Sequence, residues 1–119
     1  MPRNYLIYLH DIKSALNELH QFSSQLHIFE DLDNNTMALR AIERSLEIIG
    51  EAIKNIPENI RNCSPDIEWK KIAGLRDIII HSYFNVNHKI IWDLVKNHAP
   101  TLDKQISDLI KKVESGHCN

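Results

Sequence analysis

The segment TMALRAIERSLEIIGEAIKNIP, residues 36–57, carries the clearest fold signal of the chain. Apolar or small residues recur in it at steps of three or four, namely Ala38, Ile42, Ser45, Ile49, Ala52 and Ile56. This spacing places them on one stripe of an α-helix and leaves most of the charged residues on the other faces. Since proline cannot continue a helix, the segment predicts a helix that begins near Thr36 and ends at Pro57.

Helical periodicity also predicts four other helices. The first covers about residues 4–25, with Tyr5, Leu9, Ile12, Leu16 and Leu19 on one stripe. The third begins at Asp66 as N-cap and runs to Tyr83, with a stripe of Trp69, Ile72, Ala73, Arg76 and Ile80. Asn87 caps a fourth helix that holds Ile91, Leu94 and Val95 and ends before Pro100, and Leu102, Ile106, Leu109 and Val113 mark a fifth. Residues 23–35 and 57–65 are expected to be loops, and no strand pattern is present, so we expect one all-α domain over residues 1–119.

Composition limits the classes of function. The chain has 119 residues, 43% of them hydrophobic, and no apolar run long enough to span a membrane. The formal net charge of −2 does not indicate a general nucleic-acid binder, so any RNA contact must be local, and the candidate cations are Arg61, Lys70, Lys71 and Arg76. The first residues lack a signal-peptide layout, and we expect a cytoplasmic protein. Cys63 and Cys118 have no metal-ligand spacing and are expected to be reduced thiols.

The segment RDIIIHSY, residues 76–83, combines Arg76, His81 and Tyr83 in the spacing Arg-x4-His-x-Tyr. A neutral His81 can take the proton of a ribose 2′-hydroxyl, whose oxygen then attacks the neighbouring phosphorus. Arg76 can stabilise the charge that develops on the phosphate oxygens, and the product is a 2′,3′-cyclic phosphate. DNA lacks this nucleophile and is not expected as substrate. No metal or cofactor is needed, and the sequence has neither a HExxH motif nor a Gly-rich phosphate loop.

The helical positions of these residues raise a geometric problem. At about 100° per residue, Arg76 and Tyr83 lie within about 20° of one face, whereas His81 lies about 140° from Arg76. A regular helix therefore directs the two catalytic candidates to different sides. Either the helix unwinds around His81, or a second copy of the chain completes the site across a two-fold axis. We favour the homodimer.

Each residue of the motif also has a purely structural interpretation. Arg76 could extend along an apolar stripe and place its charge in water. His81 could interact with the negative end of the helix dipole, and Tyr83 could be an amphipathic residue at a half-buried helix end.

Several segments resemble the HepT-like toxins of the HEPN superfamily: Ile49-Gly50-Glu51-Ala52, Gly74-Leu75-Arg76-Asp77, His81-Ser82-Tyr83-Phe84 and Ile91-Trp92. The resemblance extends over nearly the whole chain. It implies an up-and-down bundle of four to five helices, a homodimer, and metal-independent cleavage of RNA. It also implies the toxin of a type VII toxin–antitoxin system, whose partner is a minimal nucleotidyltransferase antitoxin.

The resemblance assigns roles to four residues. Arg76 would stabilise the scissile phosphate, His81 would act as general base or acid, and Tyr83 would accept AMP from the antitoxin. Asp77 occupies the polar position after the arginine, where its charge would repel RNA unless it pairs with Arg76 or orients His81. The alternative function is a catalytically silent helical module that binds a nucleotidyltransferase or a nucleotide and assembles it.

Overall fold

The helix predicted from residues 36–57 is α3 (Thr36–Ile53) in the computed structural model. The structure describes residues 4–82 and 87–118, with only the backbone for residues 4 and 80–82. Its N-cap is Asn35, whose side-chain oxygen accepts a hydrogen bond from the backbone N–H of Ala38 at 3.0 Å. Such a cap satisfies one of the free N–H groups of the first turn. The predicted stripe is confirmed at Ile42, Ser45 and Ile49, which are buried, but the helix ends at Ile53 and not at Pro57.

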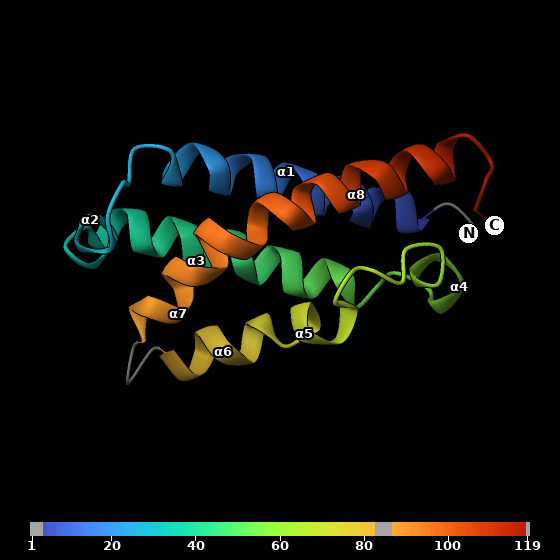
Figure 1. Ribbon diagram of the computed structural model, residues 1–119. Coiled ribbons are helices and arrows are strands. Elements are labelled where there is room, and N and C mark those ends of the chain that lie inside the picture. Colours follow the sequence, from blue (N-terminus) through green and yellow to red (C-terminus); the bar gives the residue numbers. More distant parts are fainter. Residues whose placement is uncertain (1–3, 83–86, 119) are drawn as a thin grey trace.

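Four long segments alternate in direction through the molecule (Figure 1). Helix α3 packs against α1 (Asn4–Ser23) on one side and against α6 (Leu75–Ser82) on another, and α1 also packs against α8 (Ala99–Glu114). Figure 1 shows α3 antiparallel to both α1 and α6, and α8 antiparallel to α1. The predicted all-α up-and-down bundle is confirmed, with no strand in the residues described. In the described part of the chain, no helix combines the length and the apolar composition that a membrane span requires.

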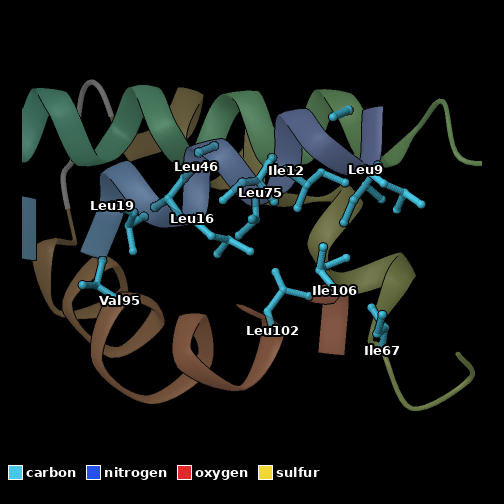
Figure 2. Packing of buried hydrophobic residues seen from close by; sticks show 14 of the residues in the cluster. Leu9, Ile12, Leu16, Leu19, Leu46, Ile67, Leu75, Val95, Leu102 and Ile106 are labelled. Carbon is cyan, nitrogen blue, oxygen red and sulfur yellow. The ribbon is translucent and has the colours of Figure 1, made fainter. Parts of the chain in front are cut away.

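The core lies where the stripes of α1, α3 and α8 meet. Figure 2 shows side chains of α1 such as Leu9, Ile12 and Leu16 directed into the same interior as Leu102 and Ile106 of α8. Leu75 of α6 reaches this cluster from another side. Because burial of such a side chain contributes about 1.5–3 kcal/mol, Leu75 anchors the first turn of α6 to this core.

The third predicted helix is interrupted, and its expected boundaries and stripe are wrong. It consists of α5 (Trp69–Ala73) and α6, separated at Gly74, and the N-cap of α5 is Glu68 instead of Asp66. On the far side of the interruption, α6 buries Leu75 and Ile79, while Arg76 is exposed. Arg76 is therefore not a core-facing residue.

The helix boundary predicted before Pro100 is present, since α8 begins at Ala99, but no loop precedes it. Asn87 is the N-cap of α7 (His88–Asp93), as expected, but the chain then continues through a π-helical turn, η1 (Leu94–His98), into α8. Proline lacks an N–H, and its ring would collide with the carbonyl of Lys96 in a regular α-helix. A wider turn before Pro100 accommodates the ring, so the helical segment bends instead of ending.

Two short helices lie within the predicted loops: α2 (Phe29–Asp33) and α4 (Glu58–Arg61). At the start of α2, the Asp31 carboxylate accepts hydrogen bonds from the backbone N–H groups of His27 at 2.8 Å and Ile28 at 3.1 Å. These bonds lower the pKa of Asp31 below its ordinary value of 3.8. Local hydrogen bonding, which apolar periodicity does not report, therefore forms this helix.

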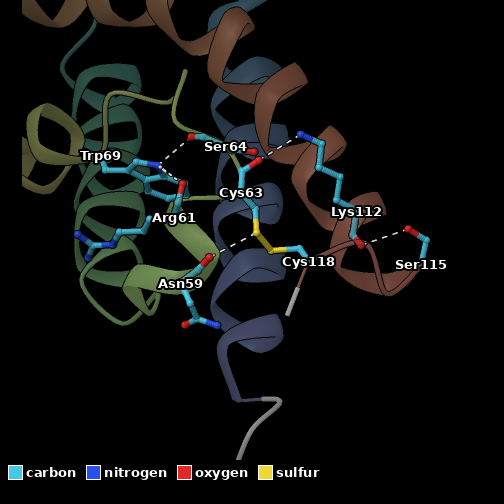
Figure 3. Close-up of a disulfide and its surroundings, with 8 residues drawn as sticks. All are labelled: Asn59, Arg61, Cys63, Ser64, Trp69, Lys112, Ser115 and Cys118. Atoms are coloured by element: carbon cyan, nitrogen blue, oxygen red, sulfur yellow. Dashed lines mark hydrogen bonds between the residues drawn. A yellow bond between two sulfur atoms is a disulfide. The ribbon is translucent and has the colours of Figure 1, made fainter.

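Cys63 and Cys118 form a disulfide, with their Cα atoms 6.1 Å apart, so the expectation of two reduced thiols is wrong (Figure 3). The bond joins the segment after α4 to the residues that follow α8. Lys112 of α8 donates a hydrogen bond to the carbonyl of Cys63 at 3.1 Å, and the Trp69 indole N–H donates to the carbonyl of Ser64 at 3.0 Å. Three contacts thus hold the segment before α5 in place.

Candidate functional site

The first turn of α6 lies very close to α3 because position 50 is a glycine. A Cβ atom there would lie 3.4 Å from the backbone nitrogen of Arg76, 3.4 Å from the Ile72 carbonyl oxygen and 3.4 Å from Leu75 Cβ. A side chain larger than that of alanine would push α6 away from α3. Gly50 therefore sets the distance at which Arg76 is presented to α3.

The Arg76 guanidinium pairs with a carboxylate of α3. Its Nη1 lies 3.5 Å from Oε2 of Glu51, and both side chains are about half exposed. Exposed ion pairs of this length contribute only about 0–1 kcal/mol, because water competes for both charges. Arg76 is therefore positioned by Glu51 but not tightly bound to it, and its remaining N–H donors are accessible to an anion.

Arg76 lies in a groove of about 450 Å³ between α1, α3 and α6, which we call the arginine groove. Its polar lining consists of Tyr8, Asp11, Arg44, Glu47, Glu51, Asn55 and Arg76. The groove thus places two guanidinium groups on one surface, although three carboxylates accompany them. The lysine candidates Lys70 and Lys71 are not among its lining residues.

His81 is in the last turn of α6, and its side chain lies outside the described atoms. The backbone is helical through Ser82, so His81 is about 140° around the axis from Arg76. With Leu75 and Ile79 buried, Arg76 and His81 are on opposite flanks of the buried stripe. The described part of one chain does not bring these two residues to one side of α6.

Asp77 and Tyr83 complete the predicted set. Asp77 is exposed, and within the described residues its side chain forms no ion pair or hydrogen bond, whereas Arg76 pairs with Glu51. Tyr83 lies outside the described residues.

Arg61, which was a candidate for RNA contact, has a structural role. Its Nε and Nη2 donate to the carbonyls of Ile56 and Ile53, each at 2.9 Å, and its guanidinium lies 5.9 Å from the centre of the Trp69 ring. These bonds satisfy carbonyls at the C-terminal end of α3, where a cation is favourable.

The sequence analysis did not identify the charged residues of α3 that line the groove as functional candidates. Glu51 was noted only within a segment that resembles the family, and Arg44 and Glu47 were not singled out. The signal that could have found them is spacing, since Arg44, Glu47 and Glu51 recur at three- and four-residue steps and share a face. No group of three potential metal ligands exists among the described residues.

Known proteins of one family are similar to this chain over most of its length. Residues 12–109 match the family model described as "Ribonuclease HepT-like". The Methanocaldococcus jannaschii protein named "Putative RNase MJ0127" is 40% identical over 107 residues, which are 90% of this chain and 88% of that protein. The Thermococcus cleftensis protein named "Probable ribonuclease HepT" is 38% identical over 111 residues, 93% of this chain and 100% of that protein.

A Caldanaerobacter subterraneus protein named "Putative RNase TTE0752" is 46% identical over 84 residues, 71% of this chain and 75% of that protein. No solved structure gives a significant match. On the strength of the family model and of these relatives, the chain belongs to the HepT-like ribonuclease family.

Proposed function

We propose that this protein is a metal-independent endoribonuclease that acts as the toxin of a type VII toxin–antitoxin system. The observation that carries the proposal is the accessible guanidinium of Arg76 in the arginine groove, on the same helix as His81. His81 removes the proton of the 2′-hydroxyl, and Arg76 stabilises the charge that develops on the attacked phosphate. Both groups act without a metal ion or cofactor. Asp77 is a supporting polar residue.

The active unit of the proposal is a homodimer. Because α6 is helical through Ser82, unwinding before that residue does not bring His81 round to Arg76. A two-fold axis near α6 would instead place Arg76 of one protomer beside His81 of its partner, and the same contact would form twice. This arrangement uses both flanks of the helix.

Regulation in the proposal rests on Tyr83, seven residues after Arg76. A minimal nucleotidyltransferase antitoxin transfers AMP to the phenol oxygen. The phosphate then competes with RNA for Arg76, and the nucleoside obstructs the site. We place toxin, antitoxin and RNA substrate in the cytoplasm.

An RNA cleavage assay in the presence of a chelator tests the activity. The parent protein should convert a single-stranded RNA to fragments that end in a 2′,3′-cyclic phosphate, and leave the matching DNA intact. His81→Ala should be slower by about 10² or more, because the acid–base group is lost. His98→Ala is the matched control, since His98 lies on η1, pairs with Asp93 at 3.1 Å and is not part of the groove.

Two results would contradict the proposed activity. One is a parental rate for His81→Ala, and the other is a parent that cleaves only when a divalent cation is added. A parent that binds a nucleotidyltransferase but leaves every RNA intact would support the alternative, the silent assembly module.

A further inference from the structure

The four arginines in the described part of the chain divide into two classes. Arg61 donates to two carbonyls at 2.9 Å, and Arg40 donates to Glu43 at 2.7 Å. Glu43 is buried, so Arg40 compensates a charge in the interior. Both arginines thus have close partners that stabilise the fold.

Arg44 and Arg76 form the other class, and both line the arginine groove. Arg44 Nη1 lies 3.7 Å from Glu47 Oε2, and the Arg44 side chain is 73% exposed. This separation is too long for a hydrogen bond, and an exposed pair of this kind adds almost nothing to stability. Among the contacts of the described residues, this pair is the one that Arg44 forms, and it does not account for an arginine at position 44.

Arg44 is placed to act together with Arg76. Arg76 contacts α3 at Glu51, which follows Arg44 by seven residues, or about two helical turns. The two positions are thus about 10 Å apart along α3, on one side of the helix. Two guanidinium groups that start from these positions can contact different phosphates of one strand.

The carboxylates of the groove oppose such a ligand. Glu47 and Glu51 are four residues apart on α3, an arrangement in which like charges repel, and each instead faces an arginine. Asp11 adds a third negative charge to the lining. Glu47 and Glu51 lie beside the two arginines, so a phosphate that binds Arg44 and Arg76 must compete with these carboxylates.

We propose that Arg44 is a second phosphate-binding residue for single-stranded RNA, and that Glu47 and Glu51 limit the affinity by competing for Arg44 and Arg76. The inference rests on the proposed ribonuclease function and deepens it. Arg44 would contact a phosphate away from the scissile bond, and it lies on α3, a helix that carries none of the motif residues.

Binding to an RNA that cannot be cleaved tests the inference. The probe is a fluorescent 2′-O-methyl oligoribonucleotide, and its affinity is measured by anisotropy over a range of salt concentrations. Arg44→Gln should lower the slope of log affinity against log salt by about 0.7 and weaken binding about fivefold at 0.1 M salt, as expected for one lost phosphate contact. Lys111→Gln is the control, because it removes the same charge from an exposed position on α8 outside the groove.

Glu47→Gln should have the opposite effect and tighten binding at low salt, whereas Asp108→Asn, an exposed position on α8, should not. The inference is overturned if Arg44→Gln and Lys111→Gln bind alike, if Glu47→Gln binds no more tightly than the parent, or if the parent does not bind the probe. Cleavage of natural RNA is measured on the same proteins. A parent that cleaves RNA while Arg44→Gln binds like the control would leave the proposed function intact and remove only the role of Arg44.

Discussion

Reduction of the Cys63–Cys118 disulfide should destabilise the protein by an amount that follows from its position. The bond joins residues separated by 55 positions and encloses α5 to α8. The entropy of closing a loop of this length in the unfolded chain corresponds to about 4 kcal/mol at 25 °C. With a urea dependence of about 2 kcal/mol/M, typical of a small domain, the midpoint of unfolding should fall by about 2 M on reduction.

Urea unfolding with and without dithiothreitol measures this effect, with the fluorescence of Trp69 and Trp92 and far-ultraviolet circular dichroism as probes. Of the two tryptophans, Trp69 reports on the segment beside the disulfide, since its indole N–H donates to the Ser64 carbonyl. Cys63→Ser is the control, and its midpoint should equal that of the reduced parent and not respond to dithiothreitol. Equal midpoints for the oxidised and reduced parent, or alkylation of both cysteines in protein that was never reduced, would refute the reasoning.

Three other predictions concern the packing, the pH dependence and the regulation of the protein. Gly50→Val should lower the free energy of unfolding, measured in urea, by about 1–3 kcal/mol because it forces α6 away from α3. Gly50→Ala should be nearly neutral because the helix propensity of alanine offsets three contacts at 3.4 Å. Equal stability of the parent and Gly50→Val would contradict this prediction. Because the pKa of Asp31 is lowered in the folded state, its contribution is present above pH 3.8 and is lost as the pH falls below that value. The parent should therefore exceed Asp31→Asn in stability at neutral pH, and a gap that persists at pH 2 would disprove this origin. Tyr83→Phe should remain toxic when the nucleotidyltransferase and ATP are supplied. Intact-mass measurement should show AMP on the parent protein only, and AMP on another residue would contradict the role of Tyr83.

The helical bundle could be predicted from the sequence because its core depends on periodic apolar residues. The stripes on α1, α3 and α8 are long and regular, and most of the residues predicted for them are buried, together with neighbours such as Leu39, Leu46 and Ile53 that widen the stripe of α3. The interruption at Gly74 could not be predicted in the same way, since the apolar residues on both sides of it fit one continuous helix. Only packing against α3, with its close contact at Gly50, selects Leu75 and Ile79 as the buried pair and exposes Arg76.

The candidate site could be predicted as a set of residue types but not as an arrangement. The spacing of Arg76 and His81 indicates the chemistry, and it correctly placed His81 on the same helix as Arg76. The partners of Arg76 come from α3, which is distant in sequence, so local patterns could not show the ion pair with Glu51 or the position of Arg44 in the same groove. The disulfide was missed for the same reason, because cysteines 55 positions apart give no local signal.

A mixing experiment with two inactive variants tests the shared ribonuclease site most directly. Arg76→Ala and His81→Ala proteins are each measured for RNA cleavage in the presence of chelator, then unfolded together, refolded to allow random pairing, and measured again. If Arg76 of one protomer acts with His81 of its partner, half of the dimers are mixed and each contains one intact site, so the mixture should regain about a quarter of the parental rate. A mixture that cleaves no faster than the separate variants would contradict a site shared between two protomers.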